Sequence, residues 1–170
     1  MTQQDDELSW NDLKALTAEV IGDGGPGSES WDPANSKVDE INERYMRALR
    51  ENNGVVPGEL SGVPSLIITT TGAKSGQKRS VPLAYAMVGE RLLIIASMGG
   101  AKRNPPWFHN LVANPDVLVE KDGETFNAKA VVSEGADRDA LFAQICDMMP
   151  VFAEYQNRTS RTIPVVELVR

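Results

Sequence analysis

The chain has few of the side chains that build metal centres and disulfides. Its 170 residues include one cysteine and one histidine. A single cysteine excludes an intramolecular disulfide framework and a multi-cysteine zinc site, and a single histidine excludes a centre built from several imidazoles, so we expect no metal. No apolar run approaches the ~18 residues needed to span a bilayer, and the polar, acidic residues 1–7 are unlike a secretory signal. The sequence therefore predicts a cytoplasmic protein.

Positive charge is also scarce, and it is unevenly distributed. Seventeen Lys and Arg face 24 Asp and Glu, for a net charge of −7, and this balance argues against a nucleic-acid partner, which would need a basic surface. Between residues 72 and 103, however, a single acid, Glu90, faces six basic residues: Lys74, Lys78, Arg79, Arg91, Lys102 and Arg103. Such a local field suits an anionic small ligand, although basic loops also keep sheet edges soluble.

Two segments of different composition divide the chain. Residues 7–21 carry a helical apolar stripe, and residues 22–30 contain four glycines and a proline, which prevent regular structure. We therefore expect residues 1–35 to form an N-terminal helix with a flexible linker, and residues 36–170 to form the main domain. Acidic rather than basic residues lie beside the apolar face of the first helix, which disfavours its docking on a membrane.

The main domain combines short apolar strands, tight turns and three helices. The apolar periodicity predicts helices over residues 36–52, 106–112 and 137–149. It predicts strands over residues 65–71, 78–88, 91–97, 116–121, 125–132 and 163–169. The connections are short and no β-α-β unit repeats, so we expect an α+β fold with a closed or nearly closed barrel of about six mainly antiparallel strands.

The turn over residues 72–79, between the first two strands, is the first candidate binding segment. Its sequence, Gly-Ala-Lys-Ser-Gly-Gln-Lys-Arg, offers two flexible glycines, a hydroxyl and three cations. Backbone N–H groups in such a turn can surround an anion that Lys and Arg side chains neutralise. It is not a P-loop, because the glycine spacing differs and a strand follows instead of a helix.

The segment over residues 96–110 is the second candidate. A buried strand ends there in the hydroxyl of Ser97, two glycines allow close approach of the backbone, and the aromatic pair Trp107 and Phe108 opens the next helix. This combination suits a flat ring held by main-chain amides beside an aromatic wall. The alternative is a simple strand-to-helix connection with its aromatic residues in the core, and we favour that alternative for Phe108.

Acid–base and nucleophilic machinery is not visible in the sequence. Cys146 falls within an apolar helical stripe and is expected to be a buried apolar residue. His109 has no neighbouring histidine or cysteine that would make it a metal ligand. A bound organic cofactor would then supply the reactive chemistry, as it does in hydride transfer.

Several motifs together resemble the deazaflavin-dependent nitroreductase family. They are Leu-Ile-Ile-Thr-Thr-Thr-Gly-Ala-Lys-Ser-Gly-Gln at residues 66–77, Val-Pro-Leu at 81–83, Ala-Ser-x-Gly-Gly-Ala at 96–101, Asn-Pro-x-Trp at 104–107, Asn-Leu-x-Ala-Asn-Pro at 110–115 and Arg-Thr-Ile-Pro-Val-Val at 161–166. The resemblance implies a split β-barrel with surrounding helices. It also implies coenzyme F420, a deazaflavin whose tail carries a phosphate and several glutamates.

The resemblance further implies roles for particular residues. The phosphate and tail of the cofactor would contact Ala73, Lys74, Ser75 and Arg79, and its path would be lined by Ser80, Val81, Pro82 and Leu83. The deazaflavin ring would face Ile95, Ala96, Ser97 and Met98. The pocket would be completed by Pro106, Trp107, Phe108, His109 and Asn110. The acceptor would contact Met149, Phe152 and Tyr155, on a segment able to cover the mouth of the barrel. Relatives carry several tyrosines there and this chain matches only Tyr155, so we expect a more apolar acceptor pocket.

The resulting prediction is an F420H2-dependent reductase. It would transfer a hydride from the reduced deazaflavin to a small-molecule acceptor that is quinone-like, nitroaromatic or otherwise electrophilic, with Ser97 and Tyr155 at the reacting atoms. Two alternatives stay open: a non-catalytic carrier of F420 or an apolar ligand, and an FMN-dependent oxidoreductase on the same barrel. The sequence leaves the physiological acceptor and the oligomeric state open.

Overall fold

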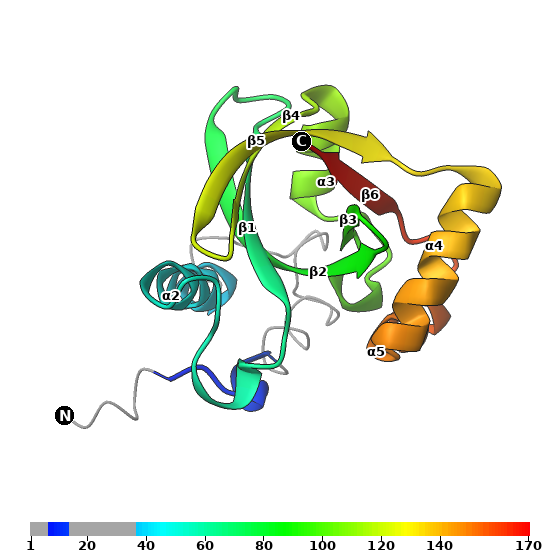
Figure 1. Cartoon of the computed structure of the whole chain (residues 1–170). Coiled ribbons are helices and arrows are strands. Elements are labelled where there is room, and N and C mark those ends of the chain that lie inside the picture. Colours follow the sequence, from blue (N-terminus) through cyan, green and yellow to red (C-terminus); the bar gives the residue numbers. More distant parts are fainter. Residues whose placement is uncertain (1–6, 14–36) are drawn as a thin grey trace.

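The structure is a computed structural model that describes residues 7–13 and 37–170 (Figure 1). Residues 10–13 are helical, within the helix predicted over residues 7–21. Residues 7–9 are not helical, so the helix begins at residue 10 and not at residue 7. Residues 14–21 of the predicted helix and the predicted linker lie outside the described residues, so the division at residue 35 stays a prediction. Across the described part of the chain, no helix has the length and apolarity that a membrane span requires.

Six antiparallel strands close into a barrel (Figure 1). The strands are β1 (Ser65–Thr71), β2 (Lys78–Val88), β3 (Arg91–Ile95), β4 (Asp116–Lys121), β5 (Glu124–Val132) and β6 (Val165–Val169). Their order around the barrel is β1-β2-β3-β6-β5-β4, and each neighbouring pair is antiparallel. The predicted α+β split barrel is confirmed.

The pairing of β3 with β6 ends earlier than the sequence predicts. Each strand is two residues shorter than expected, and the last paired residues are Ile95 and Val165. One further backbone bond joins the N–H of Ala96 to the carbonyl of Pro164 at 3.0 Å. The ladder stops there because Pro164 has no N–H to donate and Ser97 turns into a helical conformation, with φ −78° and ψ −39°.

Within residues 37–170, four helices and two short 3₁₀ turns surround the barrel. They are α2 (Lys37–Glu51), α3 (Pro106–Ala113), α4 (Gly135–Met148), α5 (Val151–Asn157), η3 (Gly58–Leu60) and η4 (Met98–Gly100). The three predicted helices of the main domain are confirmed. In Figure 1, α2 lies against one side of the barrel, and α4 and α5 lie against the other.

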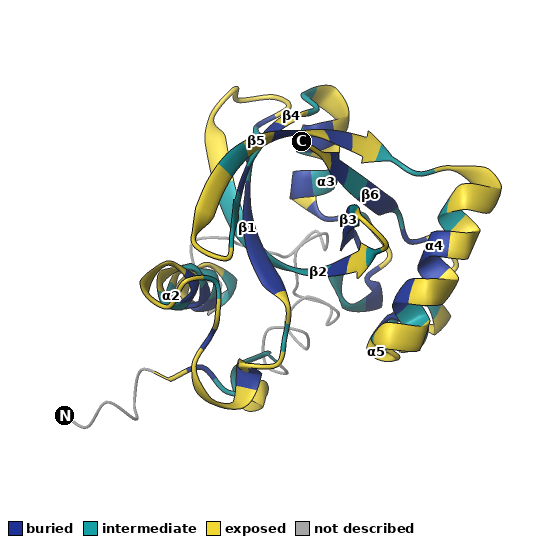
Figure 2. Ribbon diagram, in the orientation of Figure 1, coloured by how far each residue is buried: buried dark blue, intermediate teal, exposed yellow. Residues whose placement is uncertain are grey.

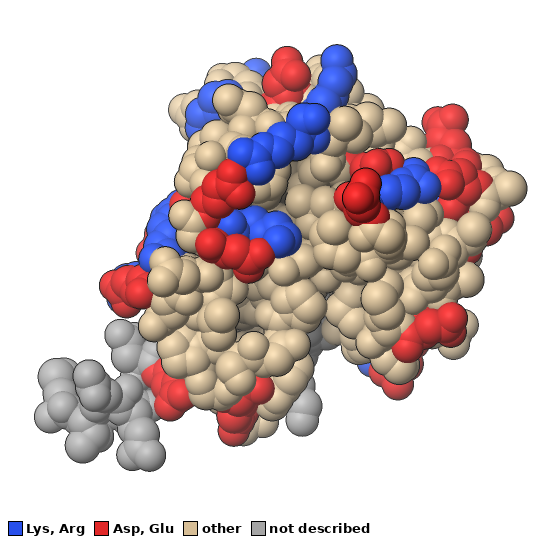
Figure 3. Space-filling view, in the orientation of Figure 1, with Lys and Arg blue, Asp and Glu red and all other residues tan. Residues whose placement is uncertain are grey.

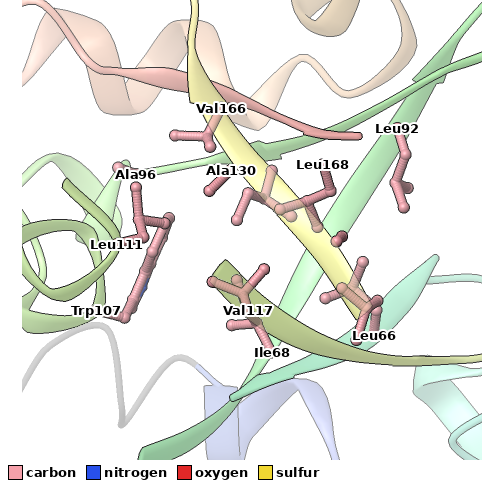
Figure 4. Close-up of a cluster of buried hydrophobic side chains, with 13 residues drawn as sticks. Leu66, Ile68, Leu92, Ala96, Trp107, Leu111, Val117, Ala130, Val166 and Leu168 are labelled. Atoms are coloured by element: carbon pink, nitrogen blue, oxygen red, sulfur yellow. The ribbon is translucent and has the colours of Figure 1, made fainter. Parts of the chain in front are cut away.

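Side chains fill the interior of the barrel. Strand residues that face inward are dark blue in Figure 2, and α3 adds Trp107 and Leu111 at one end of the barrel (Figure 4). Trp107 is 8% exposed and packs in the same cluster as Ile68, Ala96 and Val166. Because these side chains fill the interior of the barrel, a ligand has to bind on its outer face or at its rim.

Two further clusters cover parts of the outer face. Helices α4 and α5 pack Leu141, Ile145 and Phe152 against the outer side chains of β3 and β6. Helix α2 covers Ile67 of β1, and the buried hydroxyl of its Tyr45 lies 2.7 Å from Ser65 Oγ in a hydrogen bond. Neither cluster includes the end of β1 or the start of β2.

Candidate active site

The strand register brings the predicted site segments to this end of the barrel, which we call the uncovered end because neither outer cluster of the described residues reaches it. Strand β1 ends opposite the start of β2, with Thr71 paired to Lys78. Strand β3 runs antiparallel to β2, with Ile94 opposite Tyr85, so the chain after Ile95 continues toward the first half of β2. The turn over residues 72–77 and the loop over residues 96–101 therefore adjoin the same stretch of β2.

Internal hydrogen bonds define the turn over residues 72–77. The N–H of Gly72 donates to the carbonyl of Gln77 at 2.7 Å, and the N–H of Gly76 donates to the carbonyl of Gly72 at 2.9 Å. The hydroxyl of Ser75 accepts the N–H of Gln77 at 3.1 Å. A Cβ on Gly72 would lie 2.4 Å from Ser75 Oγ, so glycine is required for the hydroxyl to take this place.

Two asparagines of α3 fix this turn to the end of β1. The side chain of Asn110 accepts the N–H of Ala73 at 3.0 Å and donates to the hydroxyl of Thr70 at 3.2 Å. Asn114, one helical turn later, donates to the carbonyl of Thr71 at 3.4 Å. The N–H of Ala73 is thus already bonded within the protein, and Asn110 supports the turn through its side chain. The sequence signal for this support is the spacing of four residues between the asparagines, which places both on one helix face.

The turn keeps donors and cations available for an anion. Within the described residues, the backbone N–H groups of Lys74 and Ser75 have no hydrogen-bond acceptor. In the same part of the chain no ion pair neutralises five cations of the basic stretch: Lys74, Lys78, Arg79, Lys102 and Arg103. Backbone N–H groups in a turn beside unpaired cations form a suitable anion site.

Arg91 does not belong to this basic field, contrary to the charge count along the sequence. It lies at the far end of β2, opposite Val88, about 30 Å from Lys78 at the rise of an extended strand. Its guanidinium is paired with Asp137 at 2.9 Å and with Glu167 at 2.8 Å. These bonds raise the pKa of Arg91 and lower that of Asp137. On the face shown in Figure 3, positive and negative side chains likewise lie next to one another.

The loop after β3 has an unusual backbone. Met98, Gly99 and Gly100 all have positive φ, of 44°, 63° and 84°. A methionine in this region is strained, and such strain is frequent at functional sites. Ser97, which precedes them, is 7% exposed, and its hydroxyl has no hydrogen-bond partner within the described residues. A buried hydroxyl without a partner calls for a ligand or another explanation.

Arg161 fixes this loop by hydrogen bonds to its backbone, a role that the sequence analysis did not predict. Its Nε donates to the carbonyl of Ala101 at 2.8 Å, and Nη1 donates to the carbonyl of Ala96 at 3.1 Å and to Asn104 Oδ1 at 2.7 Å. Nη2 donates to the carbonyl of Ser97 at 2.7 Å. All four acceptors are neutral, and partial burial lowers the pKa of Arg161. The motif Arg-Thr-Ile-Pro at residues 161–164 was the available signal.

Some predicted cofactor residues point away from the uncovered end. The side chains of Ala96 and Trp107 lie in the barrel core, so Trp107 does not form a free aromatic wall, and Val81 and Leu83 pack against the same core. Ile95 is 6% exposed within the outer cluster under α4 and α5. Of the residues 80–83, the hydroxyl of Ser80 bonds Thr69 on the neighbouring strand at 2.7 Å.

The other residues of α3 divide between two faces. Pro106 and His109 are exposed. Phe108 is half-buried and lines a separate cavity of about 410 Å³ together with Asn104 and Arg138. The structure therefore brings Asn110, but not the ring of Phe108, to the turn over residues 72–77. The expectation that Phe108 packs partly in the core agrees with its contacts.

The predicted acceptor residues lie on α5 and just before it. Phe152 is 6% exposed, so it is part of the core rather than a free wall. Tyr155 is half-buried and packs edge-on against Phe152, with 5.8 Å between ring centroids. Met149 is half-buried beside the same cluster. Helix α5 also contacts η4, so Tyr155 stands next to the loop that carries Ser97 and Met98.

The lone cysteine and the acidic side chains supply no competing centre. Cys146 is half-buried against the outer cluster, and burial raises the pKa of its thiol. In residues 7–13 and 37–170, no group of three or more His, Cys, Asp or Glu side chains is placed to hold a metal ion.

Comparisons with known proteins give one consistent result. A family model described as F420H(2)-dependent quinone reductase matches residues 42–169. The chain is 43% identical over 125 residues to an F420H(2)-dependent quinone reductase of Mycobacterium tuberculosis, covering 71% of this chain and 84% of the relative.

Two solved structures are similar as well. One, an F420-H2 dependent reductase, has 38% identity and a TM-score of 0.56, covering 62% of this chain and 93% of the other. The second, described as a domain-swapped dimer, has 35% identity and a TM-score of 0.58, covering 78% of this chain and 99% of the other.

Proposed function

Because this chain belongs to the F420H2-dependent quinone reductase family, we propose that it transfers a hydride from F420H2 to a quinone, and that the uncovered end of its barrel is where both molecules bind. The enzyme is an F420-dependent oxidoreductase. The resemblance of its motifs to the deazaflavin-dependent nitroreductases points to the same family and cofactor.

The residues at this end of the barrel fit an F420 molecule. The tail of F420 is polyanionic, and the turn over residues 72–77 presents the N–H groups of Lys74 and Ser75, which have no acceptor among the described residues, beside cations that have no ion-pair partner there. Gly72 allows the hydroxyl of Ser75 to close this turn, because a Cβ on residue 72 would lie 2.4 Å from Ser75 Oγ. We assign the phosphate and tail to Lys74, Ser75 and Arg79, with Asn110 supporting the turn from α3.

The path of the cofactor then follows β2 toward the loop over residues 96–101. Ser80 and Pro82 line this path on the outer face, while Val81 and Leu83 support it from the core side. The ring would lie against the backbone of Ser97 and Met98. When bound, reduced F420 supplies a hydride from C5 of its deazaflavin.

We assign two side chains to the acceptor, Ser97 and Tyr155. Ser97 Oγ is buried and has no partner within the described residues, so it can donate a hydrogen bond to the carbonyl oxygen of a quinone. Tyr155, from α5, would orient the acceptor and supply a proton to its reduced oxygen. Met149 contributes a flexible apolar wall, and the α5 segment excludes water from the reacting atoms.

One observation carries this assignment: in the part of the chain that the structure describes, cations without an ion-pair partner, turn N–H groups without an acceptor and a buried hydroxyl without a hydrogen-bond partner occur at the same end of the barrel. An FMN-dependent enzyme would have one phosphate to bind, which leaves several of these cations without a function. A non-catalytic carrier would need the tail site and no acceptor contacts.

The deciding experiment compares cofactors and then measures turnover. Fluorescence titration with F420 and with FMN should show tighter binding of F420. When the protein and F420H2 are mixed anaerobically with menadione, F420H2 should be oxidised at a rate proportional to the enzyme concentration. Preferential FMN binding would contradict the cofactor assignment, and F420 binding without turnover over a panel of quinones would favour the carrier.

The assembly and the location of the enzyme remain part of the proposal. A solved relative is described as a domain-swapped dimer, so we propose that this chain also forms dimers, which size-exclusion chromatography with light scattering would test. The cytoplasmic location predicted from the sequence would be tested by fractionation of the source cells.

A further inference from the structure

The strongest unassigned feature near the proposed site is the set of contacts made by Arg161, a half-buried residue. Its guanidinium uses four hydrogen bonds to join one loop segment, residues 96–104, and none of its acceptors is a carboxylate. Within the described residues it has no ion-pair partner. Partial desolvation of a cation that has no counter-charge among these residues costs free energy of folding, so this arrangement points to a requirement other than stability.

The bonds of Arg161 determine how the loop presents its backbone. The carbonyl groups of Ala96 and Ser97 both point at the guanidinium. In a planar trans peptide the C=O and N–H point in opposite directions, so the N–H groups of Ser97 and Met98 point away from Arg161. Neither N–H has an acceptor within the described residues.

The same bonds oppose the strain in the loop. Met98 and the two glycines after it all have positive φ. They lie between Ser97 and Ala101, whose carbonyl groups both accept hydrogen bonds from Arg161. Without the guanidinium the carbonyls would lose their shared donor, and Met98 could relax to a conformation with negative φ.

We propose that Arg161 is a positioning residue for hydride transfer: it holds the backbone of residues 96–101 in the conformation that presents Ser97 and Met98 to the cofactor ring and the acceptor. This inference rests on the proposed function for the identity of the ligands. The conformation of the loop itself is a property of the protein alone and is tested without ligands.

The shape of the guanidinium, and not only its charge, is required. A guanidinium offers five N–H donors in a fixed plane, whereas a lysine ammonium is a compact point charge with three donors. Lysine at this position can keep the charge, but it cannot bridge Ala96, Ser97, Ala101 and Asn104 at once. Arg161→Lys is therefore the informative variant, and Arg161→Ala removes both properties.

The first test uses the ligand-free protein. Hydrogen exchange followed by mass spectrometry should show the amides of Gly100 and Ala101, which donate to the carbonyls of Ser97 and Met98, exchanging at least tenfold faster in Arg161→Lys than in the wild type. Arg138→Lys is the matched control, because Arg138 is a similarly enclosed arginine that donates to the carbonyl of Ile163 at 2.7 Å outside this loop. Unchanged exchange at Gly100 and Ala101 in Arg161→Lys would overturn the proposal.

The second test separates positioning from binding. In Arg161→Lys we expect kcat with menadione to fall at least tenfold, while the Kd for F420 stays within threefold because the tail cations are untouched. Guanidinium chloride at millimolar concentration should partly restore kcat in Arg161→Ala, but not in Arg161→Lys. If Arg138→Lys and Arg161→Lys lost the same kcat at the same loss of Tm, the role of Arg161 would be purely structural and the proposal would be refuted.

The two tests distinguish this inference from the proposed function. If the wild type fails to oxidise F420H2, the proposed function fails, and the exchange experiment still decides whether Arg161 holds the loop. If turnover is present and loop exchange is unaffected, the function stands and the role of Arg161 is rejected.

Discussion

Gly100 lies directly against the backbone of Tyr155. A Cβ built on Gly100 would be 2.5 Å from the carbonyl oxygen of Tyr155 and 2.9 Å from Cβ of Arg158. The loop proposed to face the cofactor ring and the helix proposed to cover the acceptor are therefore packed backbone to backbone. A displacement of α5 has to move η4 as well, which couples the two halves of the site.

The substitution Gly100→Ala tests this coupling. It should destabilise the protein by about 1–2 kcal/mol for an alanine at positive φ, and by a further ~1–3 kcal/mol for overpacking. Gly89→Ala is the matched control, because Gly89 has a φ of 60° and a Cβ added there would meet nothing within 4 Å. Urea denaturation should show the larger loss for Gly100→Ala, accompanied by reduced kcat. Equal losses in both variants would mean that the contact with Tyr155 contributes nothing.

The unpaired cations of the turn should determine F420 affinity. Lys74→Ala or Arg79→Ala is expected to weaken F420 binding by roughly 1–3 kcal/mol, the scale of a charge-assisted contact. The difference from wild type should shrink at high salt, which screens the attraction. Fluorescence titration at two ionic strengths measures both effects.

Arg91→Ala provides the control for that experiment. It changes the net charge by the same amount, but Arg91 is paired with Asp137 and Glu167 far from the turn. We expect reduced stability and unchanged F420 affinity. If Arg91→Ala weakened binding as much as Lys74→Ala, the charge effect would be general and the tail would not be located at the turn.

Asn110 should act on cofactor affinity through the shape of the turn. Asn110→Ala removes one acceptor for the N–H of Ala73 and one donor to Thr70, whose side chain is buried. At about 1 kcal/mol for each bond, we expect a stability loss near ~2 kcal/mol and several-fold weaker F420 binding. His109→Ala changes the exposed neighbour and should leave both Tm and the Kd for F420 unchanged. Normal affinity in Asn110→Ala would show that the turn keeps its shape unaided.

The sequence was sufficient for the barrel but not for the contacts that shape the site. Strand periodicity and hairpin glycines are local, which is why β1, β2 and β4 were predicted to the residue. The spatial order of charges is not local: Arg91 lies within the basic stretch in sequence, but in the fold it lies opposite Val88, at the end of the 11-residue strand β2 that is far from Lys78. Arg161 and Asn110 act through partners more than 35 residues away, which periodicity does not reveal. The position of Trp107 could not be predicted from the sequence either, because an aromatic residue at the start of a helix can line a ligand site or lie in the core.

Cys146 should be dispensable for turnover. Its thiol is half-buried against the outer cluster, and burial raises its pKa, so the neutral thiol predominates at pH 8. We expect slow reaction with a thiol reagent in the native state, rapid reaction in denaturant, and kcat/KM within about twofold of wild type for Cys146→Ala. Inactivation of the native enzyme at the rate of thiol labelling would contradict this expectation.

The hydroxyl of Tyr155 should affect the acceptor step and not cofactor binding. The ring of Tyr155 packs edge-on against Phe152, and the guanidinium of Arg158 lies 5.4 Å from its centroid. Phenylalanine preserves both ring contacts, so Tyr155→Phe isolates the hydroxyl. We expect kcat/KM for quinones to fall about tenfold, or ~1.4 kcal/mol in transition-state stabilisation, while the Kd for F420 stays within about twofold.

Measurements on one preparation of Tyr155→Phe distinguish the acceptor role from simple packing. If the hydroxyl contacts the acceptor, kcat/KM falls while Tm and F420 affinity are retained, because the apolar contacts with Phe152 are still made. If Tyr155 only packs on the barrel, activity is unchanged or falls together with Tm. Phe152→Leu is the comparison for the second case: it shrinks a side chain that is 6% exposed and should lower Tm first, with activity following the loss of folded protein. A Tyr155→Phe variant that behaved like Phe152→Leu would remove Tyr155 from the proposed acceptor site and leave Ser97 as its one polar contact.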